Sequence, residues 1–160
     1  MTFSIPRRSL MIGASALLLA RPAFAQTVHD VEMLNADPNN PRVRNVYSPR
    51  VLSIQPGDTV RFLSVNPGHN AQSINGMTPA GGETFRGRIN EEIEVTLTVP
   101  GIYGYQCLPH YSTGMVGLIV VEGDGKLDNL AEAQGVRHRG LAARVFDEIW
   151  AEAEAAGLLS

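Results

Sequence analysis

One short run of this chain brings together three side chains that bind soft metals. The run is Cys107-Leu108-Pro109-His110-Tyr111-Ser112-Thr113-Gly114-Met115, and it contains the only cysteine of the sequence. A second imidazole, His69, lies upstream in Asn66-Pro67-Gly68-His69-Asn70. One thiolate, two imidazoles and a thioether form the ligand set of a mononuclear blue-copper site, which transfers single electrons. The sequence therefore predicts that His69, Cys107, His110 and Met115 bind one copper ion.

The spacing of these residues suits both oxidation states of copper. Cu(I) favours thiolate and thioether, and Cu(II) favours imidazole with a strong thiolate bond. The pattern Cys107-x2-His110-x4-Met115 lets one tight loop between two strands wrap a single metal, and His69 completes the set from another loop. Tetrahedral zinc is the competing interpretation, because cysteine and histidine also bind zinc. A thioether is a poor zinc ligand, so copper is favoured, although such sites also take up zinc in vitro.

The first 25 residues predict a secretory signal peptide. Arg7 and Arg8 precede a short apolar run, and Ala23-Phe24-Ala25 supplies small residues at the two positions that a signal peptidase requires. The apolar run is too short for a membrane span of about 20 residues. The arginine pair fits twin-arginine export, and ordinary secretion stays open. Cleavage after Ala25 leaves a single domain, residues 26–160, with no membrane span.

The exported chain is acidic and keeps one lone cysteine. Loss of Arg7, Arg8 and Arg21 reduces thirteen basic residues to ten against sixteen acidic ones, so the net charge falls from −3 to −6. This balance gives no reason to expect a nucleic-acid partner. A single cysteine cannot form an internal disulfide, and a free thiol oxidises outside the cytoplasm. A role as a metal ligand explains why Cys107 is kept beside a histidine.

The middle of the chain predicts a β-sandwich. Residues 92–99 alternate between polar and apolar side chains, which indicates a strand with one buried face. Turn sequences such as Gln55-Pro56-Gly57-Asp58 separate the predicted strands. Short strands at roughly ten-residue intervals are typical of a sandwich. The other strands are expected at residues 28–34, 51–54, 59–65, 102–106 and 115–122.

The C-terminal part predicts two helices, from about residue 127 onward. Residues 127–134 and 139–156 are rich in Ala, Glu, Leu and Arg, and Gly135 separates them. Apolar residues recur at helical spacing in the second segment, so this helix is expected to pack across the sandwich. The apolar stripe consists of Leu141, Val145, Ile149 and Ala153, with Phe146 and Trp150 beside it.

Four further residues outside the ligand run receive structural interpretations. Met33 and Met77 are expected in the core or in loops. His29 and His138 lie at a strand edge and a helix start, and both are expected to be solvated.

Two residues next to the ligands are expected to tune or brace the site. Pro109 removes a backbone N–H near the sulfur, which is expected to raise the reduction potential. Asn70 either donates or accepts a hydrogen bond across to the Cys107 loop, or it forms a local Asx turn; the sequence leaves both open.

Several segments of the chain resemble pseudoazurin, a periplasmic cupredoxin of bacteria. They are Pro56–Val60, Gly68–Asn70, Gly76–Met77, Ile89–Glu91, Pro100–Gly104, Cys107–Tyr111 and Gly114–Gly117. The resemblance covers nearly all of residues 26–160, including the two helices. It implies a mainly β, eight-strand Greek-key sandwich with two C-terminal α-helices, and one type I copper held by His69, Cys107, His110 and Met115. It further implies a soluble, monomeric carrier of single electrons in the periplasm, with a nitrite reductase or a c-type cytochrome as redox partner.

The chain departs from that family in its surface charge. The family usually surrounds its copper end with lysines, and Lys126 is the only lysine here. Arg86 and Arg88 are the expected substitutes. The outer edge of His110 is expected to be the electron port, within an apolar patch that includes Pro109 and Met77.

The ligand set is compatible with one other function besides electron transfer and argues against a third. A copper-binding protein that traffics the metal itself is the alternative. An enzyme is not expected, because four protein ligands leave no open coordination position for a substrate.

Overall fold

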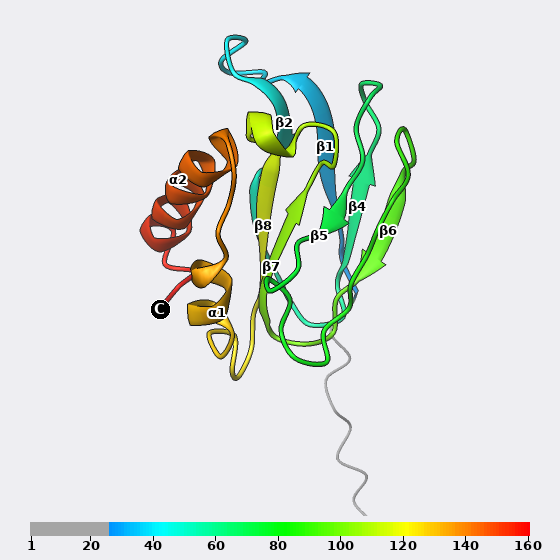
Figure 1. Ribbon diagram of the computed structural model, residues 1–160. Coiled ribbons are helices and arrows are strands. Elements are labelled where there is room, and N and C mark those ends of the chain that lie inside the picture. Colours follow the sequence, from blue (N-terminus) through cyan, green and yellow to red (C-terminus); the bar gives the residue numbers. More distant parts are fainter. Residues whose placement is uncertain (1–25) are drawn as a thin grey trace, which may run out of the picture.

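Two four-stranded sheets packed face to face form the body of the molecule (Figure 1). The structure is a computed structural model that describes residues 26–160, so the predicted signal peptide lies outside the described residues. The strand orders are β2-β1-β4-β6 and β3-β8-β7-β5. The predicted sandwich of eight strands with two C-terminal helices is confirmed.

Six of the eight strands lie close to their predicted positions, whereas the strands at Arg44–Ser48 and Gln72–Ser73 were not predicted from the sequence pattern. Residues 93–97 show the predicted alternation, because Ile93, Val95 and Leu97 point inward while Glu94 and Thr96 are exposed. The strand itself is shorter than predicted. The bounds are β1 Val28–Ala36, β2 Arg44–Ser48, β3 Val51–Ile54, β4 Thr59–Leu63, β5 Gln72–Ser73, β6 Ile93–Thr96, β7 Gly101–Gln106 and β8 Val116–Val121.

Aromatic side chains fill the space between the two sheets. The ring of Tyr105 lies edge-on to Tyr47 and Phe62, with ring centroids 4.8 and 5.1 Å away. Edge-to-face packing of this kind adds to the stabilisation from burial alone. The same core continues to Cys107 and Met115, both fully buried. The loop that carries the candidate ligands therefore rests on rigid packing.

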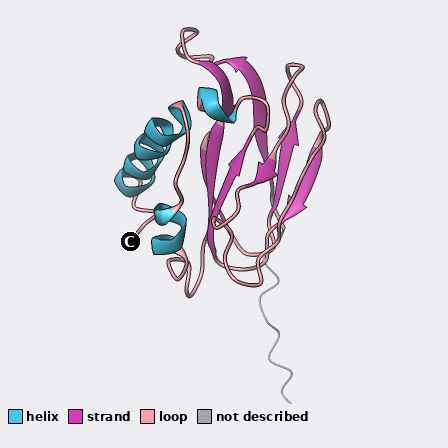
Figure 2. Ribbon diagram, viewed as in Figure 1, coloured by secondary structure: helices cyan, strands magenta, loops and turns pink. Residues whose placement is uncertain are grey.

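The two helices, α1 Leu130–Gly135 and α2 Leu141–Ala155, cover the outer face of the second sheet (Figure 2). The predicted break at Gly135 is the end of α1. Phe146 and Ile149 of α2 are buried in a second core against β7 and β8. The prediction was wrong for Leu141, which is 49% exposed because it begins the helix at the rim of a groove.

Candidate metal centre

The ligand run forms a closed loop between β7 and β8. The Cys107 N–H donates to the carbonyl of Met115 at 3.0 Å, and the Met115 N–H donates to the carbonyl of His110 at 3.1 Å. A single 3-10 turn, η1 Tyr111–Thr113, reverses the chain, and Gly114 ends it at a φ of 95°. Such a positive φ favours glycine. The predicted tight loop is confirmed.

Three of the four candidate donors converge on one point. The Nδ1 atoms of His69 and His110 are 3.1 Å apart. The Sγ atom of Cys107 lies 3.8 Å from the first and 3.6 Å from the second. Donors this close together could all reach one metal ion, whose bonds to nitrogen and sulfur are about 2.0 to 2.3 Å long. The triangle therefore fits one metal ion.

Met115 lies beside this triangle. Its side chain is fully buried in the same core cluster as Cys107, and its backbone is hydrogen-bonded to both Cys107 and His110. The loop thus holds Met115 beside two of the three converging donors, and its thioether would serve as the fourth, weaker ligand.

His69 is oriented by a residue that the sequence did not single out. Its Nε2–H donates to Oδ1 of Asn35 at 2.9 Å, since that oxygen only accepts. The lone pair of the imidazole is then on Nδ1, which faces Cys107 and His110. Burial, with the nearby His110, lowers the pKa of His69. The ring is therefore neutral and able to bind a metal at neutral pH.

Asn70 joins the two ligand loops, so the cross-loop alternative is confirmed. Its Oδ1 accepts the Leu108 N–H at 2.7 Å, and its Nδ2 donates to the carbonyl of Gly87 at 3.0 Å. Its own carbonyl accepts the hydroxyl of Tyr47 at 2.6 Å. These bonds fix the position of Cys107 relative to His69.

The sulfur of Cys107 is buried but has polar neighbours. Burial raises the pKa of the thiol, and hydrogen bonds from the backbone N–H groups of Asn70 and His110 act in the opposite direction. Pro109 has no N–H to add to these donors. A buried sulfur with few donors matches the environment predicted from the sequence.

Comparison with known proteins identifies the family. The family model for copper-binding proteins of the plastocyanin/azurin family matches residues 39–122. Pseudoazurin from Methylorubrum extorquens is 38% identical, over 89% of this chain and 95% of the relative. Pseudoazurin from Paracoccus pantotrophus is 42% identical, over 71% of this chain and 76% of the relative.

This chain belongs to the pseudoazurins of the plastocyanin/azurin family. Solved pseudoazurin structures agree: one from Sinorhizobium has a TM-score of 0.75 at 41% identity and covers 81% of this chain and 98% of that one. The pseudoazurin of Methylobacterium extorquens AM1 has a TM-score of 0.71 at 37% identity and covers 78% and 98%. Copper is therefore the cofactor of this chain, and the family carries electrons.

The copper end of this pseudoazurin exposes apolar side chains. Leu108 and Ile89 are 52% and 55% exposed and line a small hollow together with Arg86 and Arg88. His110 is half-buried, whereas His69 is fully buried, so His110 is the imidazole that reaches the surface.

The expected place of Met77 in this patch was wrong. Met77 is fully buried in the helix-side core against Gly104. A Cβ on Gly104 would lie 2.6 Å from the Met77 sulfur, so the missing side chain at Gly104 makes the space that Met77 fills.

The prediction that the two remaining histidines are simply solvated was wrong. His138 stacks on Phe146, with ring centroids 3.9 Å apart, and its Nδ1 is hydrogen-bonded to the hydroxyl of Tyr111 at 2.8 Å. His29 lies 2.9 Å from a carboxylate oxygen of Asp58. His138 therefore ties the segment before α2 to the ligand loop.

Proposed function

We propose that this chain is a periplasmic one-electron carrier in which His69, Cys107, His110 and Met115 hold one copper ion. The observation that carries the proposal is the donor triangle, with two imidazole nitrogens and one thiolate sulfur 3.1 to 3.8 Å apart. Bound there, copper supplies a one-electron couple between Cu(I) and Cu(II).

The protein residues keep the site the same in both oxidation states. Asn35 holds the ring of His69, Asn70 holds the loop at Leu108, and the sandwich core surrounds Cys107 and Met115. Ligands tied to packed strands and to buried hydrogen bonds resist movement when the charge of the site changes. Little rearrangement per electron favours fast exchange.

His110 is the proposed route of the electron to a partner. It is the ligand imidazole closest to solvent, and exposed Leu108, Pro109 and Ile89 lie at the same end of the molecule. Electron-transfer pairs associate weakly through small contacts of this kind. A nitrite reductase or a c-type cytochrome is the partner that the family resemblance supports.

Four protein donors also argue against catalysis at the metal. No coordination position would remain for a substrate, so the proposed function is transport of electrons and not an enzymatic reaction. The export pattern of residues 1–25 supports the periplasmic location. Among residues 26–160, no helix is long and apolar enough to cross a membrane. We include a monomeric state in the proposal, as the family resemblance implies.

A visible absorption spectrum of the oxidised, copper-loaded protein tests the proposal. An intense thiolate-to-copper band is expected, and Cys107→Ser should abolish it because the sulfur is the electron donor of that transition. Met115→Leu is the matched control: it should keep copper and colour, with a higher reduction potential. A strongly coloured Cys107→Ser protein would contradict the assignment. Copper loss to a chelator on reduction, without a reversible one-electron wave, would instead favour copper trafficking.

A further inference from the structure

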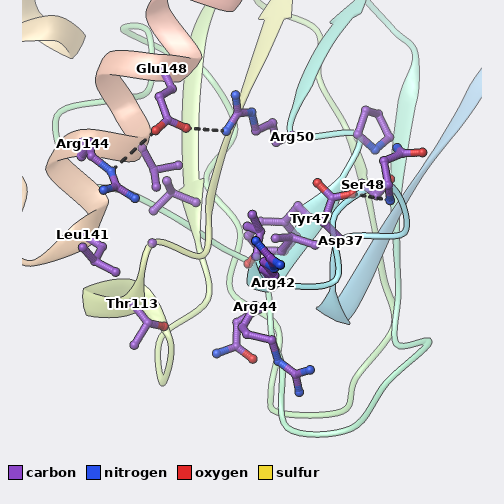
Figure 3. A pocket seen from close by; sticks show the side chains of 18 of the residues that line it. Asp37, Arg42, Arg44, Tyr47, Ser48, Arg50, Thr113, Leu141, Arg144 and Glu148 are labelled. Carbon is purple, nitrogen blue, oxygen red and sulfur yellow. Dashed lines mark hydrogen bonds and ion pairs between the residues drawn. The ribbon is translucent and has the colours of Figure 1, made fainter.

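A groove runs along the flank of the molecule, between β2 with its preceding loop and the first turns of α2. Its volume is about 810 Å³. Figure 3 shows Arg42 and Arg44 on one wall, Leu141 and Arg144 on the other, and Thr113 of the ligand loop at one end. The groove therefore reaches the turn of the ligand loop at Thr113 and Gly114, and it shares no lining residue with the small hollow at Arg86 and Arg88.

The charges on the α2 wall are already paired. Arg50 contacts Glu148 and Glu152 at 3.1 and 2.8 Å, and Arg144 contacts Glu148 at 3.6 Å. These pairs cancel one another and also hold α2 against the end of β2. This wall offers a ligand little net charge.

The opposite wall carries uncompensated positive charge. Arg42 and Arg44 are exposed, and within the described part of the chain no ion pair involves either of them. The nearby carboxylate of Asp37 accepts the backbone N–H of Asn39 at 2.7 Å and keeps its negative charge, so Asp37, Arg42 and Arg44 together give this wall a net charge of +1. A pair of free arginines in a protein whose exported chain has a net charge of −6 marks a local site for anions.

The groove also has an apolar lip on each side. Val43 is 45% exposed on the arginine wall, and Leu141 is 49% exposed on the α2 wall. β2 is the end strand of its sheet, and all of its residues line the groove. An edge strand can accept an extended chain, while pockets beside it select alternate side chains.

From these features we infer that the groove binds an extended, acidic segment of a protein partner. Carboxylates of the segment would pair with Arg42 and Arg44, and an apolar side chain would lie between Val43 and Leu141. A single phosphate would fill little of this volume, and a nucleic acid would be repelled by the net negative charge of the protein. The inference goes beyond the proposed function and does not depend on it, since the segment can bind whether the copper carries electrons or is itself delivered.

The test is a titration of the Cu(I)-loaded protein, followed by amide NMR. The probe is a capped hexapeptide in which aspartate alternates with leucine. Chemical-shift changes are expected at Arg44, Thr113 and Leu141. Arg42→Gln with Arg44→Gln should weaken binding about tenfold, because both arginine–carboxylate pairs are lost. Both arginines are exposed and outside the core, so the variant should fold like the parent.

Matched controls separate the alternatives. Arg86→Gln with Arg88→Gln should leave the affinity unchanged, and the peptide with asparagine in place of aspartate should bind far more weakly. The inference is overturned if the groove amides do not shift, or if both arginine pairs matter equally. It is also overturned if inorganic phosphate alone causes the same shifts at the same concentration, which would indicate a simple anion site.

Discussion

The two flanks of the ligand loop are braced by different kinds of contact. On the sandwich flank, Asn35 and Asn70 use hydrogen bonds within the core, and Asn70 itself is only 2% exposed. On the helix flank, the half-buried pair Tyr111 and His138 joins the loop to the segment before α2.

The two flanks contact different parts of the ligand loop. The sandwich flank reaches a donor directly, at His69, and also the neighbour of a donor, at Leu108. The helix flank contacts the far turn of the loop: the Cβ position of Gly114 lies 2.8 Å from Val145, and that of Gly140 lies against the Ser112 carbonyl. The sandwich thus sets the positions of the ligands, whereas the helices keep the turn closed.

Asn70→Ala should be the most damaging change to the sandwich flank. It leaves the Leu108 N–H and the Gly87 carbonyl without their partner, and each unsatisfied buried group costs about 1–3 kcal/mol. We expect the free energy of unfolding to fall by about 2–4 kcal/mol in guanidinium titrations, with faster loss of copper to a chelator. Asn39→Ala, on an exposed turn, is the control. A loss no larger than that of the control would show that this flank is not a rigid anchor.

The sequence was sufficient for six of the eight strands and for the ligand run, because alternation and ligand spacing are local signals. It missed β2 and the two-residue β5, which are short and lie in turn-rich segments. Asn35 was missed because its bond to His69 joins residues 34 positions apart and belongs to no motif. The same holds for His138, whose partner Tyr111 is 27 positions away. Met77 was misplaced because the space that it fills depends on Gly104 of β7, 27 positions away in the sequence.

Tyr111→Phe tests the helix flank with a smaller expected effect. Burial raises the pKa of Tyr111, so its hydroxyl stays protonated and hydrogen-bonds to His138 as a neutral group. Loss of this bond should lower the free energy of unfolding by about 1 kcal/mol while the copper absorption stays unchanged. His138→Phe alone and the double variant complete a double-mutant cycle. A coupling energy near zero would show that this hydrogen bond does not contribute to stability.

The pH dependence of stability tests His138 on the helix flank. Burial lowers the pKa of His138, while Asp147 acts in the opposite direction. Folded His138 therefore stays neutral at a pH where the unfolded chain, near its ordinary value of about 6.5, binds a proton. Stability should fall as the pH drops below about 6.5, and His138→Gln should reduce that loss in unfolding measured from pH 8 to pH 5. Equal slopes for both proteins would contradict the prediction.

The last prediction concerns the charges beside the sandwich flank, where Arg86 and Arg88 adjoin exposed Leu108. Arg86→Glu with Arg88→Glu should slow electron exchange with an acidic redox partner severalfold at low salt, because like charges then oppose the encounter. The difference should shrink as salt rises, since the Debye length falls from about 30 Å at 0.01 M to about 10 Å at 0.1 M. Arg86→Lys with Arg88→Lys keeps the charge and should match the parent in stopped-flow rates. Rates that are identical at every salt concentration would remove these arginines from the docking face, and faster exchange in the glutamate variant would indicate a basic partner.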